Sequence, residues 1–384
     1  MSAERAFPES EYRVRRSRLA ALMEARGLDA VFFAPSSDLE YLTGIERELP
    51  SFGQVSYTHG WVAGAFFVPD REPVFVLPRM VVAFHLFDRA PESSIVVNEG
   101  DDGAALFADS ARSLGRVRRV GVGARTWSET ILHLRQALPD AELTEATSLL
   151  NELRRVKSDA ELEAITYACR IAEEAMVATT AKVEPGVSPV ELAEEVEHQM
   201  RIRGSRTPSF PTHIFTFGRE DSRDSTLPSG TEPIRAGEPV LFDFGAVHQG
   251  YCSDFGRTIV SGEPPPEYHR VYDVMLAAQE AGRATAVPGA LAREVNAACR
   301  APIEAAGLGE FFRHRMGHGI GLDVHEHPFI SVEDDTPLEP GMTFTDEPSI
   351  VWPGHFGVRI EDIVVCTEAG GRRLTELSTG AVVT

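Results

Sequence analysis

Residues 240–260 read VLFDFGAVHQGYCSDFGRTIV, and this stretch decides the fold of the C-terminal half. Two apolar runs flank a turn near residues 248–250, which predicts an antiparallel β-hairpin. Asp243 and Asp254 are equidistant from that turn, so we expect them to face one another across the ladder. Facing carboxylates in an apolar strand repel one another unless a cation lies between them. The alternative is a pair near the turn that is bound to Arg257 or to backbone amides.

A second hairpin of the same design is predicted at residues 343–365, which read TFTDEPSIVWPGHFGVRIEDIVV. Its two strands carry Glu347 and Glu361, and Arg359 shares the face of Glu361 because it lies two residues before it. The acidic residues next to each glutamate are predicted to point to the opposite face. A salt-bridged hairpin surface is the alternative. Two hairpins that each present two inward carboxylates are expected to form the halves of one site.

Between the hairpins, residues 314–328 read HRMGHGIGLDVHEHP and contain four histidines. Glycines at alternate positions around His318 are costly in a helix and let the backbone approach closely, so His318 and His325 are predicted on extended chain. A lone histidine in such a segment is usually packed in the core or in a loop. A histidine cluster between two dicarboxylate hairpins favours a metal ligand and a proton carrier.

The candidate ligands are one imidazole and four carboxylates: Asp243, Asp254, His318, Glu347 and Glu361. This mainly oxygen set suits a two-ion site for Mn²⁺, Co²⁺, Fe²⁺ or Zn²⁺, because four negative charges neutralise two divalent ions. Water between two such ions is deprotonated near neutral pH, and the ions stabilise a tetrahedral oxyanion. The set therefore predicts hydrolysis of an amide bond.

With these residues in view, the C-terminal half resembles the pita-bread metallopeptidases (peptidase family M24), which include proline dipeptidase, aminopeptidase P and methionine aminopeptidase. Residues 314–326 match the proline-peptidase signature, and residues 357–362 (GVRIED) match the final motif of the family. Residues 38–44 (DLEYLTG) and 153–163 (LRRVKSDAELE) resemble the N-terminal domain and linker helix of the proline-specific branch. Methionine aminopeptidases usually lack that domain. The resemblance covers nearly the whole chain.

The N-terminal part alternates strand-like and helical segments, which predicts an α/β domain with a partly parallel sheet. A composition shift near residues 150–157 leads into two long helices that begin with capping boxes, at Ser158 and at Ser188. The resemblance implies a creatinase-like N-terminal α/β domain, residues 1–152, and an α+β pita-bread catalytic domain, residues 153–384.

The resemblance also implies roles for individual residues. The five candidate ligands match the ligand order of the family, with Mn²⁺ as the expected ion and Co²⁺ or Zn²⁺ as alternatives. His325 matches a histidine that contacts the substrate and helps to stabilise the tetrahedral intermediate, and Glu347 is expected to accept a proton. Arg359 matches an arginine near the substrate, where it either binds a carboxylate or orients Glu361.

One departure from the family concerns the substrate. Proline peptidases usually carry a histidine in a Leu-(Pro)-His stretch before the first metal aspartate, whereas residues 227–230 read LPSG, with Ser229 at that position. His213 is expected either to take over this role from a neighbouring strand or to be an ordinary packed histidine.

The first functional hypothesis is an Xaa-Pro dipeptidase, which acts on small peptides with proline at the second position. A dipeptidase needs a cation for the carboxylate of the substrate, and Arg359, Arg219 or Arg223 is a candidate. The alternatives are an aminopeptidase P that acts on longer peptides, a creatinase-like hydrolase or lyase on the same fold, and a binding module without catalysis.

The composition of the chain narrows its possible partners and its location in the cell. The 384-residue chain has a formal net charge of −21, which disfavours nucleic-acid or anionic membrane partners. No signal peptide or spanning segment is predicted. The four cysteines form no CxxC pair and are expected to be buried and free, so a cytoplasmic location is predicted.

The resemblance further implies a homodimer in which the N-terminal domain of one subunit approaches the active site of the other. Tyr57, His59 and Trp61 are expected on a loop that makes this contact. Local packing of these aromatic residues is the alternative.

Overall fold

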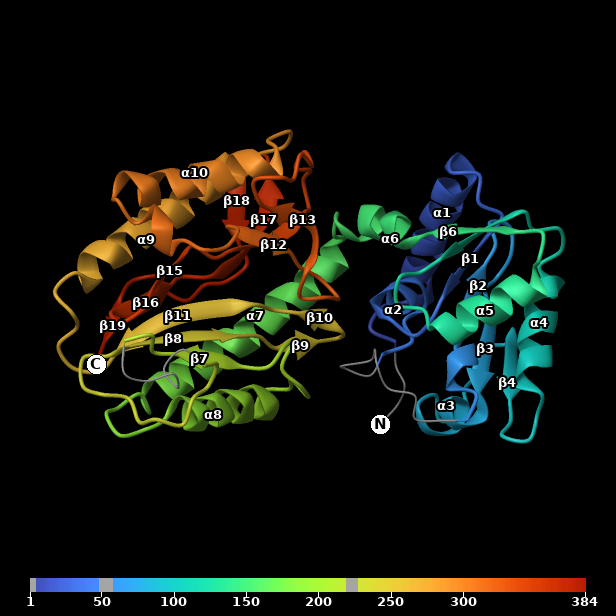
Figure 1. Cartoon of the computed structure of the whole chain (residues 1–384), viewed down its shortest axis with the longest axis horizontal. Coiled ribbons are helices and arrows are strands. Elements are labelled where there is room, and N and C mark those ends of the chain that lie inside the picture. The colour runs from blue at the N-terminus through green and yellow to red at the C-terminus, as the bar shows by residue number, and fades with distance from the viewer. Residues whose placement is uncertain (1–4, 48–57, 219–226) are drawn as a thin grey trace. The chain divides into compact units, whose positions relative to one another are not determined.

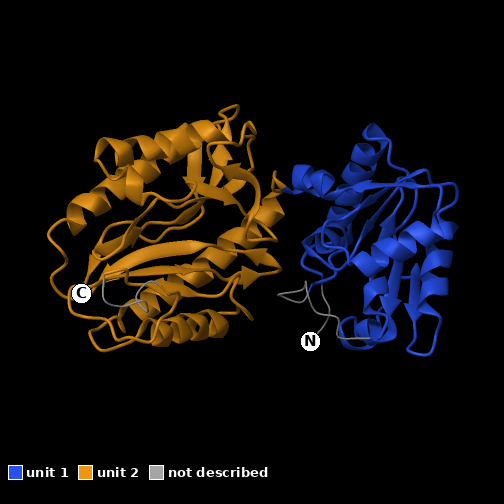
Figure 2. Cartoon of the chain, viewed as in Figure 1, with its two compact units in different colours: residues 1–154 blue, residues 155–384 orange. Residues whose placement is uncertain are grey.

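The computed structural model describes residues 5–47, 58–218 and 227–384 (Figure 1). The chain divides into two compact units, residues 1–154 and 155–384 (Figure 2). Among the described residues, unit 1 has one six-stranded sheet and its own apolar core, and unit 2 has two main sheets, each with its own apolar core. Across the described part of the chain, no helix combines the length and the apolar character needed to cross a membrane.

Unit 1 is an α/β domain. Its described strands are β1 (Ala30–Phe33), β2 (Gly64–Phe67), β3 (Val74–Pro78), β4 (Ser94–Val97), β5 (Arg119–Val122) and β6 (Glu142–Glu145). Its described helices are α1 (Glu9–Ala25), α2 (Ser37–Thr43), α3 (Arg79–Phe84), α4 (Gly103–Ser113), α5 (Ser128–Ala137) and α6 (Thr147–Arg154). The six strands lie in the order β4-β3-β2-β1-β5-β6, with three parallel and two antiparallel pairs. The predicted partly parallel sheet is confirmed.

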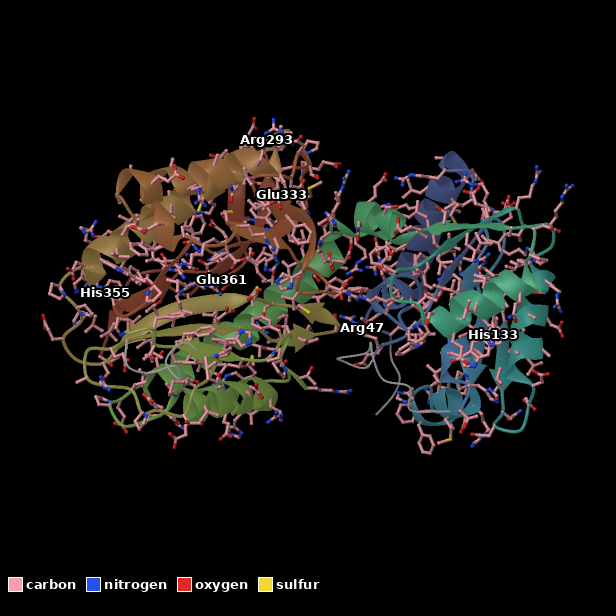
Figure 3. All side chains as sticks on the ribbon, in the orientation of Figure 1. Arg47, His133, Arg293, Glu333, His355 and Glu361 are labelled. Atoms are coloured by element: carbon pink, nitrogen blue, oxygen red, sulfur yellow. The ribbon has the colours of Figure 1, made fainter. Side chains whose placement is uncertain are left out.

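Trp61 lies inside unit 1, in the short 3₁₀ helix η1 (Gly60–Val62). Its side chain is 8% exposed, and its ring stacks on that of His133 with the centroids 4.1 Å apart; Figure 3 labels His133. The expectation that Trp61 lies on a loop reaching towards a second subunit is therefore wrong, and the alternative of local packing is confirmed for it. His59 is half-buried directly before η1, and Tyr57 lies outside the described residues.

Unit 2 repeats one theme twice, a helix pair packed on a sheet. Its described helices are α7 (Asp159–Thr180), α8 (Pro189–Ile202), α9 (Tyr268–Thr285), α10 (Ala292–Ala305) and the 3₁₀ helix η3 (Gly309–Phe311). Its first strands are β7 (His213–Phe215), β8 (Pro239–Phe244), β9 (Val247–His248), β10 (Tyr251–Cys252) and β11 (Phe255–Val260). The later strands are β12 (Gly317–Gly319), β13 (Glu326–Ile330), β14 (Thr343–Asp346), β15 (Ser349–Trp352), β16 (Phe356–Arg359), β17 (Asp362–Thr367), β18 (Gly370–Arg373) and β19 (Val382–Val383).

These strands form two main sheets, in the orders β19-β11-β8-β7 and β13-β12-β14-β17-β18. The pairs β9–β10 and β15–β16 extend the two hairpins as separate ribbons. Apolar side chains of α7 and α8 pack on the first sheet, and those of α9 and α10 pack on the second. Figure 1 shows the ribbons of these helices beside the strands of unit 2. Both predicted hairpins and the predicted α+β class of this half are confirmed.

The helices α7 and α8 begin where their sequences predict. Ser158 accepts a hydrogen bond from the backbone N–H of Glu161, and the Glu161 carboxylate accepts one from the N–H of Ser158 at 2.9 Å. Ser188 and Glu191 make the same reciprocal pair, with a proline at the first position of α8. Each capping box satisfies backbone donors that the first turn of a helix leaves without partners.

Candidate metal centre

The first hairpin brings Asp243 and Asp254 together, but not as directly opposed residues. Asp243 in β8 is paired with Gly256, because the turn consists of Gln249 and Gly250, both with positive φ. Asp254, directly before β11, is therefore a diagonal neighbour of Asp243. The expectation that the two aspartates face one another across the ladder is wrong by this register, although both side chains reach the same site.

Gly256 makes room for Glu361. A Cβ atom added at Gly256 would lie 2.7 Å from Glu361 Oε2 and 2.8 Å from Arg359 Cδ. The backbone of Gly256 also bridges the two hairpins, since its carbonyl accepts a hydrogen bond from the N–H of Glu361 at 3.0 Å. The absence of a side chain opposite Asp243 thus admits Glu361 to the site.

The second hairpin contributes two carboxylates from one face. Asp346 and Asp362 are paired across the ladder, so Glu347 and Glu361, each one residue further toward the turn, lie opposite one another on the other face. Asp346 and Asp362 are both fully buried on their own face. Thr345 donates a hydrogen bond from Oγ1 to Glu347 Oε1 at 3.1 Å, which fixes that carboxylate.

His318 lies in β12, as the glycine pattern predicts. A side chain at Gly317 would collide with the carbonyl of Thr345, so the close approach of β12 to β14 requires glycine there. His325, which was expected on extended chain, lies instead in a bend directly before β13, and its ring centroid is 4.1 Å from that of His318. The His325 side chain is exposed, but its partial desolvation and the neighbouring His318 lower its pKa, so its imidazole is neutral at neutral pH.

The five candidate ligands converge on one point. His318 Nε2 lies 3.4 Å from Asp254 Oδ2 and 3.4 Å from Glu347 Oε1. One carboxylate oxygen from each of Asp243, Asp254 and Glu361 lies within 4.8 Å of the other two. Glu361 is buried in the interior of unit 2, where Figure 3 labels it.

This cluster fits cations. Asp254 Oδ1 and Glu361 Oε2 are buried and have no hydrogen-bond partner in the structure. A buried acceptor without a donor is costly, and a cation satisfies it. Four ionised carboxylates and the guanidinium of Arg359 leave three uncompensated negative charges, so divalent ions match the donor set in both charge and chemistry.

Without cations the cluster retains protons. Burial raises the pKa of Asp243 to about 7, against the opposing effect of Arg359. Burial, followed by the charge of Asp254, raises the pKa of Glu361 well above its ordinary value. Burial also disfavours a charged His318, but the hydrogen bond to Asp254 and the nearby carboxylates outweigh it and raise the pKa of His318. Protonation thus relieves repulsion that cations would otherwise relieve.

Arg359 lies among these carboxylates. Its Nη1 bonds to Asp243 Oδ2 and lies 3.6 Å from Glu361 Oε2, while Nη2 lies 3.8 Å from Glu347 Oε2. The alternative in which Asp243 is bound to Arg257 is not found, because Arg257 donates to Asp362 instead.

His213 lies in β7, directly opposite Asp243. Ser229, which occupies the position of the expected family histidine, donates from Oγ to the carbonyl of Thr212 at 2.9 Å and from its N–H to that of Ile214 at 2.9 Å. The loop with the substitution therefore lies against the strand segment that carries His213. Burial, then the charge of Arg359, lowers the pKa of His213, so the ring is neutral at neutral pH.

A cavity of about 420 Å³ surrounds the cluster. Besides the ligands, Arg359, His213 and His325, it is lined by Phe210, His314, Arg315 and Val324. These four were missed by the sequence reasoning, although His314 stands four residues before His318 in the same signature. Arg219 and Arg223, expected candidates for binding a substrate carboxylate, lie outside the described residues.

Comparison with known proteins identifies the family. Residues 163–368 match metallopeptidase family M24, and residues 15–156 match the creatinase/prolidase N-terminal domain. An Xaa-Pro dipeptidase from Lactobacillus delbrueckii subsp. lactis is 36% identical over 373 residues, which cover 94% of this chain and 96% of that protein.

Solved structures of prolidases and X-Pro aminopeptidases have a fold similar to that of this chain. A prolidase from Thermococcus sibiricus has a TM-score of 0.86 at 28% identity and covers 97% of this chain and 99% of its own. An X-Pro aminopeptidase from Thermotoga maritima has a TM-score of 0.79 at 26% identity and covers 93% of this chain and 98% of its own. The expected creatinase-like N-terminal domain followed by a pita-bread catalytic domain is confirmed. The chain therefore belongs to metallopeptidase family M24 and carries the N-terminal domain that creatinases and prolidases share.

Proposed function

We propose that the protein is a dinuclear-metal Xaa-Pro dipeptidase, which hydrolyses dipeptides with proline at the second position. The convergence of four carboxylates and one imidazole, with two buried oxygens that lack hydrogen-bond partners, is the observation that carries the proposal. The named activity of relatives such as the Lactobacillus delbrueckii dipeptidase supports the substrate class.

The ligand assignment is part of this proposal. Family M24 implies two divalent ions, and we assign them to Asp243, Asp254, His318, Glu347 and Glu361, with Mn²⁺ as the expected ion and Co²⁺ or Zn²⁺ as alternatives. Bound there, the ions would activate water and polarise the scissile carbonyl.

The surrounding side chains bind and orient the reacting groups. We assign Glu347 as the proton acceptor, since it lines the cavity and its Oε1 accepts a hydrogen bond from Thr345 that orients the carboxylate. A neutral His325 is suited to donate a hydrogen bond to an oxygen that gains negative charge. For Arg359 we favour the orienting role, which its contacts with three carboxylates support.

Turnover of Ala-Pro compared with Ala-Pro-Ala, each with Mn²⁺, tests the substrate class. A dipeptidase is expected to cleave Ala-Pro at least tenfold more efficiently, because a free carboxylate next to proline is then recognised by a cation. Efficient cleavage of the tripeptide would instead assign an aminopeptidase P, the alternative that the likeness to the Thermotoga maritima enzyme supports. Cleavage of neither, with activity on a small zwitterion that survives chelation, would indicate the creatinase-like alternative.

His213 provides a test of the substrate site. We propose that it replaces the family histidine absent at Ser229, since it lines the cavity opposite Asp243. The substitution His213→Gln is expected to lower kcat/KM for Ala-Pro by about 10²-fold, the lower end of general acid–base effects, with bound metal unchanged. The matched control is His355→Gln, an exposed histidine at the far hairpin turn, labelled in Figure 3. Equal activity of the two variants would assign His213 to packing alone.

We also propose a homodimer, a cytoplasmic location, and domain limits of 1–152 and 153–384, two residues before the division between the two compact units. The four cysteines support a reducing compartment, because all are buried and free: Cys169, Cys252, Cys299 and Cys366.

A further inference from the structure

Arg257 is a buried arginine behind the metal centre, in β11. All five N–H donors of its guanidinium are used, which fixes the side chain in one orientation. Nη1 donates to the carbonyls of Gly256 and Glu361, at 2.8 and 2.7 Å. Nη2 donates to Asp362 Oδ1 at 2.8 Å. The remaining N–H of Nη2 and that of Nε donate to the carbonyls of Leu377 and Ser378, which belong to the C-terminal segment, residues 375–384. Its guanidinium carbon lies 4.3 Å from the centroid of the Phe255 ring.

Two of these contacts act on the backbone of a candidate ligand. Glu361 donates its N–H to Gly256 and accepts from Arg257 at its carbonyl, so both its backbone polar groups are bound to β11. The next residue, Asp362, is held from the opposite face by Arg257, by Thr375 Oγ1 at 2.6 Å and by Gln279 Nε2 at 2.9 Å. The position of Glu361 relative to Asp254 therefore depends on groups outside the cavity.

The C-terminal segment is the other partner of Arg257. The carbonyls of Leu377 and Ser378 accept from its guanidinium at 3.4 and 3.3 Å. The N–H groups of Glu376 and Leu377 donate to Glu173 of α7. Tyr272 of α9 donates to the carbonyl of Thr379 at 2.9 Å, and β19 pairs with the end of β11. Residues 375–384 are thus anchored to the strand that follows Asp254.

We propose that Arg257 and the C-terminal segment act as one positioning device, which holds Glu361 at the distance from Asp254 that binding of the second metal ion requires. The inference rests on the metal centre of the proposed function and goes beyond it, because it makes metal affinity depend on residues that never touch the cavity. Arg257 is a positioning residue, since it reaches the backbone of Glu361 and not the substrate. Lysine cannot replace it, because one ammonium group cannot reach both hairpins and the C-terminal segment at once.

Calorimetric titration of Mn²⁺ into metal-free protein tests this. For Arg257→Lys, the dissociation constant of the weaker Mn²⁺ site is expected to rise 10- to 100-fold, the usual effect of losing a group that orients a ligand. Activity on Ala-Pro should fall at limiting Mn²⁺ and recover with excess Mn²⁺, with KM for the peptide unchanged. The matched control is Arg15→Lys, an equally buried arginine of unit 1, which is expected to leave both Mn²⁺ affinities unchanged.

Unchanged affinities in a folded Arg257→Lys would overturn the proposal. If that variant does not fold, Thr375→Val removes only the hydroxyl on Asp362 and is expected to weaken the same Mn²⁺ site about threefold; unchanged binding in Thr375→Val would overturn the proposal equally. Absence of Mn²⁺ binding in the unsubstituted protein would contradict both the proposed metal centre and this inference. Loss of Xaa-Pro hydrolysis with normal Mn²⁺ binding would count against the proposed substrate class alone.

Discussion

Glu361→Gln is expected to lower kcat/KM for Ala-Pro by on the order of 10³-fold, because a metal centre supplies several kcal/mol of transition-state stabilisation and each 1.36 kcal/mol is a factor of ten. Glutamine keeps the shape of Glu361 but removes the charge that we assign to the ions. Fewer than two Mn²⁺ per chain should then be bound, as elemental analysis would measure. The hairpins should stay paired, since the backbone contacts of Glu361 with Gly256 and Arg257 do not involve its side chain.

The same substitution should raise the stability of the metal-free protein at pH 8. Burial and the charge of Asp254 make an ionised Glu361 unfavourable, and a neutral amide avoids that cost. The matched control is Glu368→Gln, an exposed residue in the turn after β17, which should change neither activity nor stability. A Glu361→Gln protein with two bound Mn²⁺ and activity within tenfold of the unsubstituted enzyme would contradict the ligand assignment.

Local patterns sufficed to predict which strands carry the carboxylates, but not their register. The alternation of side chains along a strand correctly places Glu347 and Asp346 on opposite faces, because this prediction depends only on the two-residue period of a strand. The pairing of Asp243 depends instead on which two residues form the turn. Gln249 adopts a positive φ there, which is uncommon for glutamine, so the sequence gives little reason to centre the turn on it.

Contacts between residues far apart in the chain could not be predicted from the sequence either. The sequence offers Arg257 several acidic residues, and its choice of Asp362 over Asp243 follows from the approach of two hairpins a hundred residues apart. Trp61 likewise finds His133 only once α5 packs on the same core. Gly256 did carry a usable signal, since a glycine inside a strand often marks a close approach of another segment.

Removing the metal is expected to reverse the pH dependence of stability between pH 6.5 and 8. In the metal-free folded protein the pKa of Asp243 is raised to about 7 from an ordinary 3.8, and those of Glu361 and His318 are raised as well. The folded state then binds more protons than the unfolded state in this range, so the free energy of unfolding falls as pH rises, by up to about 1.4 kcal/mol per pH unit for each proton. The histidines with lowered pKa, such as the half-buried His213 and the exposed His325, act in the opposite direction; because an unfolded imidazole titrates near 6.5, their effect fades between about pH 6.5 and 7.5.

Bound Mn²⁺ should displace these protons, so that metal affinity, and with it the stability of the loaded protein, rises over the same range. Urea unfolding at pH 6.5, 7.0, 7.5 and 8.0, with EDTA or with saturating Mn²⁺, measures how the free energy of unfolding changes with pH in the metal-free and in the loaded protein. Asp243→Asn is the informative variant, because it removes one of the retained protons and should flatten the slope of the metal-free protein. A metal-free protein whose stability is constant or rises between pH 6.5 and 8 would mean that the carboxylates do not repel one another, and the physical reason for a cation among them would be lost.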